Sequence, residues 1–320
     1  MFVSSRDDRK VYKVFDVLIE ACRATAPVSM AVVSPTTEVA IAGAIAAAKE
    51  GLIEPILVGE EGAVRRAADA AQLDISPFPL VSASDDFDAA QKSVALCRTG
   101  RAHALMKGSL HTDTLMHAVL DSAAGLRTLR RVSHIFVLDA PAYPRPLLIT
   151  DAGINIYPTL DDKVDIVRNA IDLAQAIGIQ VPNVAILSAV ETVNPKITST
   201  LDAAALCKMA DRNQITGAVL DGPLAFDTAV SAQAAEIKGL SSRVAGSADV
   251  LVVPDIESGN MLAKQLEYLG GAELAGVVLG ARVPIVLTSR ADAPRARLAS
   301  CAVAAAYVRA RISHVETHSG

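Results

Sequence analysis

Short apolar runs alternate with longer amphipathic segments along nearly the whole chain. Each run is rich in Val, Ile and Leu and is bounded by polar residues, glycine or proline, as expected for a buried strand. We therefore expect strands at 29–33, 54–58, 104–107, 133–138, 147–150, 184–188, 217–220, 249–253 and 284–288. Strands that alternate with helices build parallel sheets, so the predicted fold class is α/β, with largely parallel sheets and flanking helices.

The intervening segments carry helical signals. The apolar stripe of a first helix is Val11, Val14, Phe15, Leu18 and Cys22. Thr159 and Asp162 form a capping box that opens another helix, whose apolar positions then recur at helical spacing. We expect further helices at 38–51, from Ser258 through Tyr268, and at 294–311.

Two interruptions suggest a division into two domains. Three prolines fall within residues 140–146, and a second crossover is plausible near 275–278. We expect residues 1–139 together with 278–320 to form one α/β domain. Residues 140–277 would form a second domain that is involved in dimerisation.

Composition narrows the class of protein. The chain has 320 residues, of which 51% are hydrophobic and 20% charged, which excludes a disordered or fibrous protein. A net charge of −5 argues against general binding to nucleic acid or to a membrane surface. The N-terminus lacks an apolar signal core, and the four cysteines lack metal-ligand or disulfide spacing. We expect a cytoplasmic protein without a metal site.

Two strand ends carry the most informative chemistry. The strand at 249–253 is followed by Ser258, Gly259 and Asn260, which open a helix, and backbone N–H groups at such a junction attract anions. Asp255 is placed to cap the same helix. Ser289 and Arg290 follow the strand at 284–288, at its carboxyl end. Ligands of open α/β sheets bind at this edge. The sequence thus predicts an enzyme that handles phosphorylated substrates.

Four segments together resemble the phosphate acetyltransferase and phosphate butyryltransferase family. They are LMKGSLHT at 105–112, LLITDAGINIYP at 147–158, VLDGPLAFDTAVS at 219–231, and PDIESGNMLAKQLEYLGGA with TSRAD between 254 and 292. The chain is especially similar to the acyltransferase part of fusions with an enoyl-CoA hydratase. The match follows the order of the chain over nearly its full length.

This resemblance implies a two-domain subunit similar to isocitrate and isopropylmalate dehydrogenases, a homodimer, and an active site in the interdomain cleft. The implied reaction is acyl-CoA + phosphate ⇌ acyl phosphate + CoA, with CoA as a substrate and no permanently bound cofactor or metal. Ser289 and Arg290 are catalytic by resemblance. In the acetyl branch an aspartate seven residues after the serine is the proposed base for CoA. In this sequence Ala296 occupies that position, so we expect Asp292 to act as the base instead.

The remaining candidates lie at predicted strand ends and helix starts, where side chains can face a substrate. We expect substrate contacts from Lys107, Gly108, Ser109, His111, Thr112, Thr150, Asp151, Asn155, Asp221, Glu257, Ser258, Gly259, Asn260 and Lys264. Several also have a purely structural interpretation: Asp151 can cap a turn, and Lys264 can be a surface residue.

Two alternatives stay open. One is a metal- and NAD(P)-dependent 2-hydroxy-acid dehydrogenase on the same architecture, although no GxGxxG fingerprint is present. The other is a non-catalytic sensor of CoA or acyl phosphate that has lost its base at Ala296.

Overall fold

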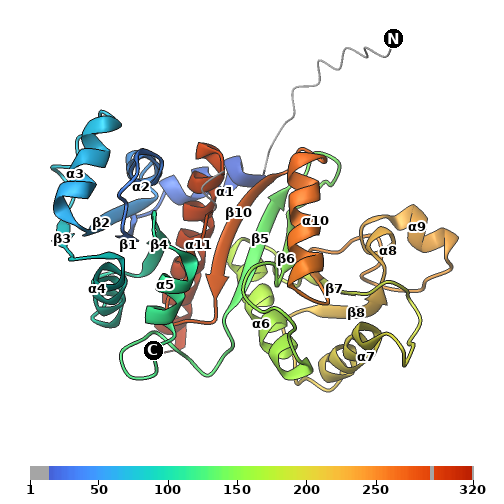
Figure 1. Ribbon diagram of the computed structural model, residues 1–320. Coiled ribbons are helices and arrows are strands. Elements are labelled where there is room, and N and C mark those ends of the chain that lie inside the picture. Colours follow the sequence, from blue (N-terminus) through green and yellow to red (C-terminus); the bar gives the residue numbers. More distant parts are fainter. Residues whose placement is uncertain (1–13, 289–291, 319–320) are drawn as a thin grey trace, which may run out of the picture.

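The computed structural model describes residues 14–288 and 292–318, with side chains up to residue 312. It contains one β-sheet with both parallel and antiparallel strand pairs, flanked by helices. Within these residues the sheet is 11-stranded, in the order β3-β2-β1-β4-β11-β10-β5-β6-β9-β7-β8 (Figure 1). Helices cover both of its faces. The predicted α/β class, with largely parallel strand pairing, is confirmed.

The first half of the sheet comes mainly from the N-terminal part of the chain. Its strands are β1 (Val28–Val33), β2 (Ile53–Gly59), β3 (Leu80–Ser82), β4 (Ala104–Lys107) and β11 (Ile285–Val286). Its helices are α1 (Val14–Arg23), α2 (Glu38–Lys49), α3 (Glu61–Ala70), α4 (Asp86–Arg98), α5 (Thr112–Val119) and α11 (Pro294–His318).

The second half and the centre come from the middle of the chain. The strands are β5 (Ser133–Asp139), β6 (Leu147–Thr150), β7 (Asn183–Leu187), β8 (Val219–Leu224), β9 (Val250–Val252) and β10 (Glu273–Leu279). The helices are α6 (Leu160–Ala176), α7 (Thr198–Asp211), α8 (Phe226–Val230), α9 (Ala232–Ile237) and α10 (Ile256–Tyr268).

All nine predicted strands are present, but two corrections are needed. Strand β8 runs on to Leu224 where we predicted an end at 220, because Asp221 still pairs with β7 and Leu224 pairs with it again after a register shift. The segment 275–278, near which we expected the chain to cross between the domains, is part of strand β10, which was not predicted as a strand. It pairs antiparallel with both β5 and β11 and so joins the two halves.

The register places the ends of many strands in one row. Because β10 is antiparallel to β11 and β5, and β5 is antiparallel to β6, the strands of the two halves run in opposite directions. Even so, the last or next-to-last residues of β1, β4, β11, β6 and β9 align across the sheet. The row reads Val32, Met106, Val286, Val277, Ile135, Thr150 and Val252. The segments that follow these strands therefore converge on the middle of the sheet.

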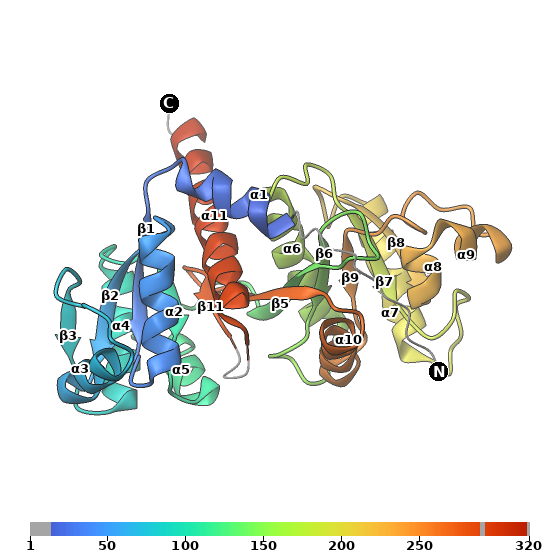
Figure 2. The same ribbon diagram turned by 90° about the horizontal axis from the view of Figure 1, so that it is seen from above.

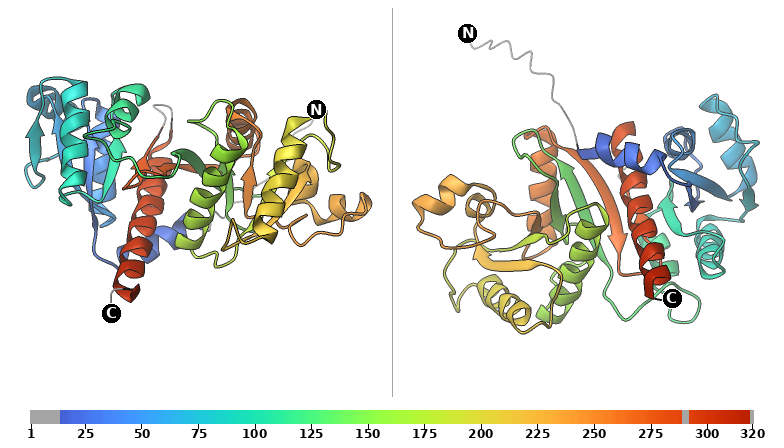
Figure 3. Two further views of the ribbon diagram at one scale, coloured as in Figure 1. Left: turned by 90° about the horizontal axis from the view of Figure 1, so that it is seen from below. Right: turned by 180° about the vertical axis from the view of Figure 1, so that it is seen from behind.

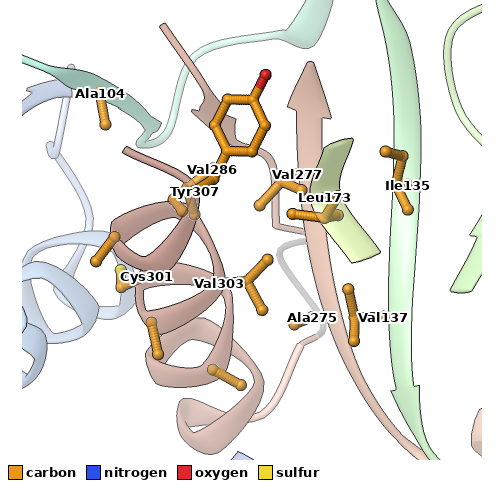
Figure 4. Packing of buried hydrophobic residues seen from close by; sticks show 14 of the residues in the cluster. Ala104, Ile135, Val137, Leu173, Ala275, Val277, Val286, Cys301, Val303 and Tyr307 are labelled. Atoms are coloured by element: carbon orange, nitrogen blue, oxygen red, sulfur yellow. The ribbon is translucent and has the colours of Figure 1, made fainter. Parts of the chain in front are cut away.

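Three apolar cores hold the helices to the sheet. The largest lies on the face covered by α1, α2, α6 and α11, and it continues across both halves of the sheet. Figure 4 shows its centre, where Cys301 and Val303 of α11 lie among Val277, Val286 and Ile135. In Figure 3 (right), the view from behind, α11 and α1 lie over this face.

The opposite face has two separate cores. One lies under α4 and α5 and includes Leu115 and Val94, and the other lies under α10 and includes Ala263 and Leu251. The view from above shows α5 and α10 on this same side of the sheet (Figure 2). Strands β11, β10 and β5 lie in the sheet between the strands under these two cores.

Candidate functional site

A pocket of about 340 Å³ lies where β1, β4 and β11 end. Its lining combines the start of α2, the loop after β4, the residue before Ser289, and the first turn of α11. The lining residues are Thr37, Val39, Ala40, Gly108, Ser109, Thr288 and Arg297. The structure thus brings the predicted Gly108 and Ser109 together with the segment that leads into the Ser289–Arg290 pair.

Close backbone packing shapes the loop after β4. The Gly108 and Ser109 amides donate to the carbonyl oxygens of Val33 and Ser34, at 2.9 and 2.8 Å. A Cβ atom on Gly108 would lie 2.3 Å from the Val33 oxygen, so this position accepts only glycine without a shift of the backbone. The Ser109 hydroxyl lies 3.0 Å from the hydroxyl of Thr37, which caps α2. The loop and the N-terminus of α2 therefore face the pocket together.

Arg297 places a cation at the wall of this pocket, and the sequence analysis missed it. Its guanidinium donates to the Thr288 hydroxyl at 3.2 Å and to the Asp292 carbonyl oxygen at 3.4 Å. The residue is 5% exposed, and burial lowers the pKa of its guanidinium. Gly43 of α2 makes room, since a Cβ there would lie 3.0 Å from Arg297 Cδ. A cation in the first turn of a helix is unfavourable for the helix dipole. This unusual placement is the feature of the sequence that could have identified Arg297.

Asp292 connects the pocket to the second half of the sheet. Its carboxylate lies 4.0 Å from the ammonium of Lys264 on α10, and its side chain is 15% exposed. Lys264 also pairs with Glu267 at 2.7 Å and lies 5.8 Å from the centre of the Phe136 ring. The predicted Asp292 and Lys264, which are distant in sequence, are therefore neighbours beside strand β5.

The predicted Asp151 and Asn155 lie in a buried turn after β6. The Asp151 carboxylate accepts hydrogen bonds from the amides of Gly153, Ile154 and Asn155, at 2.9, 3.0 and 3.1 Å. The Asn155 side chain adds a further bond at 2.5 Å and accepts one from Arg131 at 2.8 Å. Burial nevertheless raises the pKa of Asp151. These contacts support the turn-capping interpretation of Asp151, and its substrate contact stays a prediction.

The start of α10 packs against this turn. Asp255 and Ser258 form a reciprocal capping box, so the predicted N-cap is confirmed. A Cβ on Gly259 would lie 2.7 Å from the Asp151 carbonyl oxygen, and the Asn260 amide donates to Ala152 at 3.3 Å. Gly259 therefore allows the helix to approach the turn closely, while Glu257 is exposed.

The other predicted residues are more dispersed. Thr150 is fully buried and donates to the His134 carbonyl oxygen at 2.9 Å. His111 is exposed at the start of α5, Thr112 is its first residue, and Asp221 lies within β8 at the edge of the sheet. Ser289 and Arg290 lie outside the described residues.

Burial disfavours the thiolate form of the described cysteines. Burial raises the pKa of the thiols of Cys97, Cys207 and Cys301 to about 12, so they are not thiolates at neutral pH. Among the described residues, no three His, Cys, Asp or Glu side chains are grouped to hold a metal ion. A larger hollow of about 1100 Å³ between α6, α11 and residues 128–130 contains none of the predicted site residues.

Comparison with known proteins decides the family. The family model described as "Phosphate acetyl/butaryl transferase" matches residues 81–305. The chain belongs to this family. It is 60% identical over 297 residues to a phosphate acetyltransferase of Rhizobium meliloti, covering 93% of this chain and 94% of that protein. It is 44% identical over 259 residues to a phosphate butyryltransferase of Clostridium acetobutylicum, covering 81% of this chain and 86% of that protein.

Solved structures agree with this assignment. A branched-chain phosphotransacylase from Enterococcus faecalis superposes with a TM-score of 0.77 at 32% identity, covering 88% of this chain and 99% of the other. A 4-hydroxythreonine-4-phosphate dehydrogenase from Klebsiella pneumoniae reaches 0.53 at 14% identity, which shows a shared fold alone. The predicted family and the predicted acyltransferase class are confirmed. In the described part of the phosphate acetyl/butyryl transferase chain, no helix is long and apolar enough to span a membrane.

Because a histidine is buried beside the site, we predict that the folded protein becomes less stable in acid. His134 is 2% exposed, and burial, followed by the nearby charge of Lys264, lowers its pKa to about 4 from 6.5. Between these pH values the unfolded chain binds a proton that the folded chain excludes. The free energy of unfolding should therefore fall by about 3 kcal/mol as the pH drops from 6.5 to 4. Above about pH 7.5, where the imidazole is neutral in the unfolded chain as well, this residue should contribute no pH dependence.

The control is His134→Gln, which removes the titrating group and keeps a polar side chain. Denaturant unfolding at several pH values should show a smaller acid loss in this variant than in the wild type. Parallel curves for the two proteins between pH 6.5 and 4 would contradict the buried neutral state.

Proposed function

We propose that this protein catalyses the reversible transfer of a short acyl group between CoA and inorganic phosphate. The observation that carries the proposal is the pocket at the ends of β4 and β11. It combines a buried guanidinium, the N-terminus of α2 and a glycine loop directly beside the TSRAD segment of the transferase family. CoA acts as a substrate, and no cofactor is permanently bound.

The pocket has the chemistry that phosphate requires. Guanidinium groups bind phosphate oxygens through charge-assisted hydrogen bonds, and amides at a helix start add a favourable field. In this proposal Arg297 and Arg290 bind phosphate, while Ser289 hydrogen-bonds the carbonyl oxygen as it becomes tetrahedral. Lys107, Gly108 and Ser109 form the adjoining wall. The other predicted substrate contacts, from His111 through Lys264, belong to the same proposal.

The acyl group passes directly from sulfur to phosphate oxygen. The phosphate oxygen bonds to the carbonyl carbon, the carbon–sulfur bond breaks, and the thiolate leaves and takes up a proton. Holding both reactants in one pocket converts a bimolecular step into an effectively unimolecular one. The high pKa of the described thiols supports this route over an acyl-enzyme on cysteine.

From the family resemblance we further propose two domains with the boundaries given above, a homodimer, and a cytoplasmic location. Relatives that act on acetyl and on butyryl groups both match the chain. The acyl group is accordingly proposed as short, without a choice between the two.

A thiol-release assay tests the proposed function. Purified protein is incubated with acetyl-, propionyl- or butyryl-CoA, with and without phosphate, and free CoA is measured. We expect release that depends on phosphate and persists in EDTA. Tight acyl-CoA binding without any turnover would favour the sensor, and loss of activity in EDTA with recovery on adding a divalent ion would contradict a metal-free reaction.

Asp292 is the proposed base that removes the CoA proton in the direction of acyl-CoA synthesis. A thiol with a pKa near 8.5 is only a few per cent ionised at neutral pH, so a base should assist it. We expect Asp292→Asn to lower kcat in this direction by about 100-fold, with part of the loss recovered at high pH. Thermal stability should change little.

The matched control is Asp161→Asn, which alters an exposed aspartate in the first turn of α6. It should leave turnover unchanged. If Asp292→Asn keeps wild-type turnover across pH 6 to 9, Asp292 is not the base.

A further inference from the structure

We propose that Ser34 is a positioning residue, whose left-handed backbone holds the loop after β4 against the start of α2 and so shapes the pocket between them. The inference rests on the proposed acyl transfer, because this pocket is where phosphate would bind. Ser34 directly follows strand β1, and none of the segments that carry the family resemblance includes it.

The backbone conformation of Ser34 is unusual for its place in the fold. Among the described residues, three that are not glycine have a positive φ: Ser34 at 48°, Gln72 at 54° and Asn213 at 57°. Gln72 and Asn213 are exposed and follow the C-caps of α3 and α7, where a left-handed residue commonly ends a helix. Ser34 is 1% exposed and follows a strand, so no helix end accounts for its conformation.

The local sequence does not favour this conformation. A residue with a Cβ disfavours the left-handed region, because the Cβ crowds the following carbonyl oxygen. The next residue is Pro35, and a residue that precedes proline favours extended backbone. The surrounding structure must therefore impose the conformation of Ser34. Backbone strain of this kind is concentrated at functional sites, which is the reason to ask what it achieves here.

Both backbone polar groups of Ser34 bond to neighbouring segments. Its amide donates to the Val58 carbonyl oxygen on β2 at 2.7 Å. Its carbonyl oxygen accepts from the Ser109 amide in the loop after β4 at 2.8 Å, and from the Thr36 amide at 2.9 Å. One oxygen thus joins the loop to the segment that leads into α2. With the amide fixed on β2, a change to a negative φ would turn this oxygen away from its two donors.

The loop after β4 packs closely on Ser34 and carries its position into the pocket. A Cβ on Gly108 would lie 2.5 Å from the Ser34 carbonyl oxygen and 2.7 Å from the carbonyl carbon. The next residue, Ser109, places its hydroxyl 3.0 Å from that of Thr37, the N-cap of α2. Gly108, Ser109 and Thr37 all line the pocket. Ser34 therefore acts on the site through these three residues.

Two substitutions separate the backbone conformation of Ser34 from its hydroxyl group. Ser34→Gly removes the hydroxyl and adopts a positive φ without strain, whereas Ser34→Thr keeps the hydroxyl and adds a β-branch that opposes a positive φ. We expect kcat/KM for phosphate, measured as CoA release, to fall about tenfold or more for Ser34→Thr. For Ser34→Gly it should stay within about threefold of wild type.

The matched control is Asn213→Thr, which introduces the same β-branch at an exposed residue with a positive φ, after α7 in the other half of the sheet. Both Thr variants should lower the melting temperature by a few degrees, but Asn213→Thr should leave turnover unchanged. An equal loss of turnover in the two Thr variants would assign the effect to stability alone and contradict a positioning role.

Amide hydrogen exchange gives a readout that does not depend on activity. The Ser109 amide should exchange faster in Ser34→Thr than in wild type, and at close to the wild-type rate in Ser34→Gly. If Ser34→Thr does not fold, Gly108→Ala disturbs the same contact from the loop side. It should also lower kcat/KM for phosphate and accelerate exchange at Ser109.

The outcomes keep this inference distinct from the proposed function. If the wild type releases no CoA, the proposed function fails, and the exchange rates still decide the positioning role. The inference is overturned by wild-type kinetics in folded Ser34→Thr or Gly108→Ala, or by unchanged exchange at Ser109. A loss in Ser34→Gly as large as that in Ser34→Thr would also overturn it, because the hydroxyl and not the backbone would then be required.

Discussion

The antiparallel pairing of β10 with both β11 and β5 is the constraint on which the rest of the structure depends. It reverses the strand direction at the centre of the sheet while the register keeps the ends of both sets of strands in one row. Because of this arrangement, the segments after β4, β11 and β6 converge from opposite directions. A sheet with parallel pairing throughout would place all these segments at a single edge.

The convergence explains why charge and close backbone packing occur together. Arg297, Asp292 and Lys264 form a sequence of neighbouring charges from the pocket to α10, and each is at least partly removed from water. Low solvent exposure strengthens the interaction of such groups with a reacting anion. Glycines at 108, 259 and 276 let the surrounding backbone approach to distances that a Cβ would prevent, and Gly153 lies close to the side chain of His134. Glycines that allow close packing therefore contribute to the site as much as the charged side chains do.

Much of this could be predicted from local sequence, and the reason is physical. Apolar runs identified nine strands, and the Asp255–Ser258 capping box was evident because its hydrogen bonds connect residues three apart. Strand β10 was missed because the segment ELAGVVL carries Ala and Gly beside a predicted boundary. Arg297 and His134 were missed because their roles depend on pairing across the sheet, which no local pattern encodes. The proximity of Asp292 to Lys264 likewise required the fold.

The central claim is that phosphate and CoA occupy one site and exchange the acyl group directly. The most direct test follows isotopically labelled CoA into unlabelled acetyl-CoA in the presence of the enzyme. Direct transfer predicts that label appears in acetyl-CoA only when phosphate is present, since acetyl phosphate is the sole intermediate carrier. Exchange at a comparable rate in phosphate-free solution would reveal an acyl-enzyme and contradict the account.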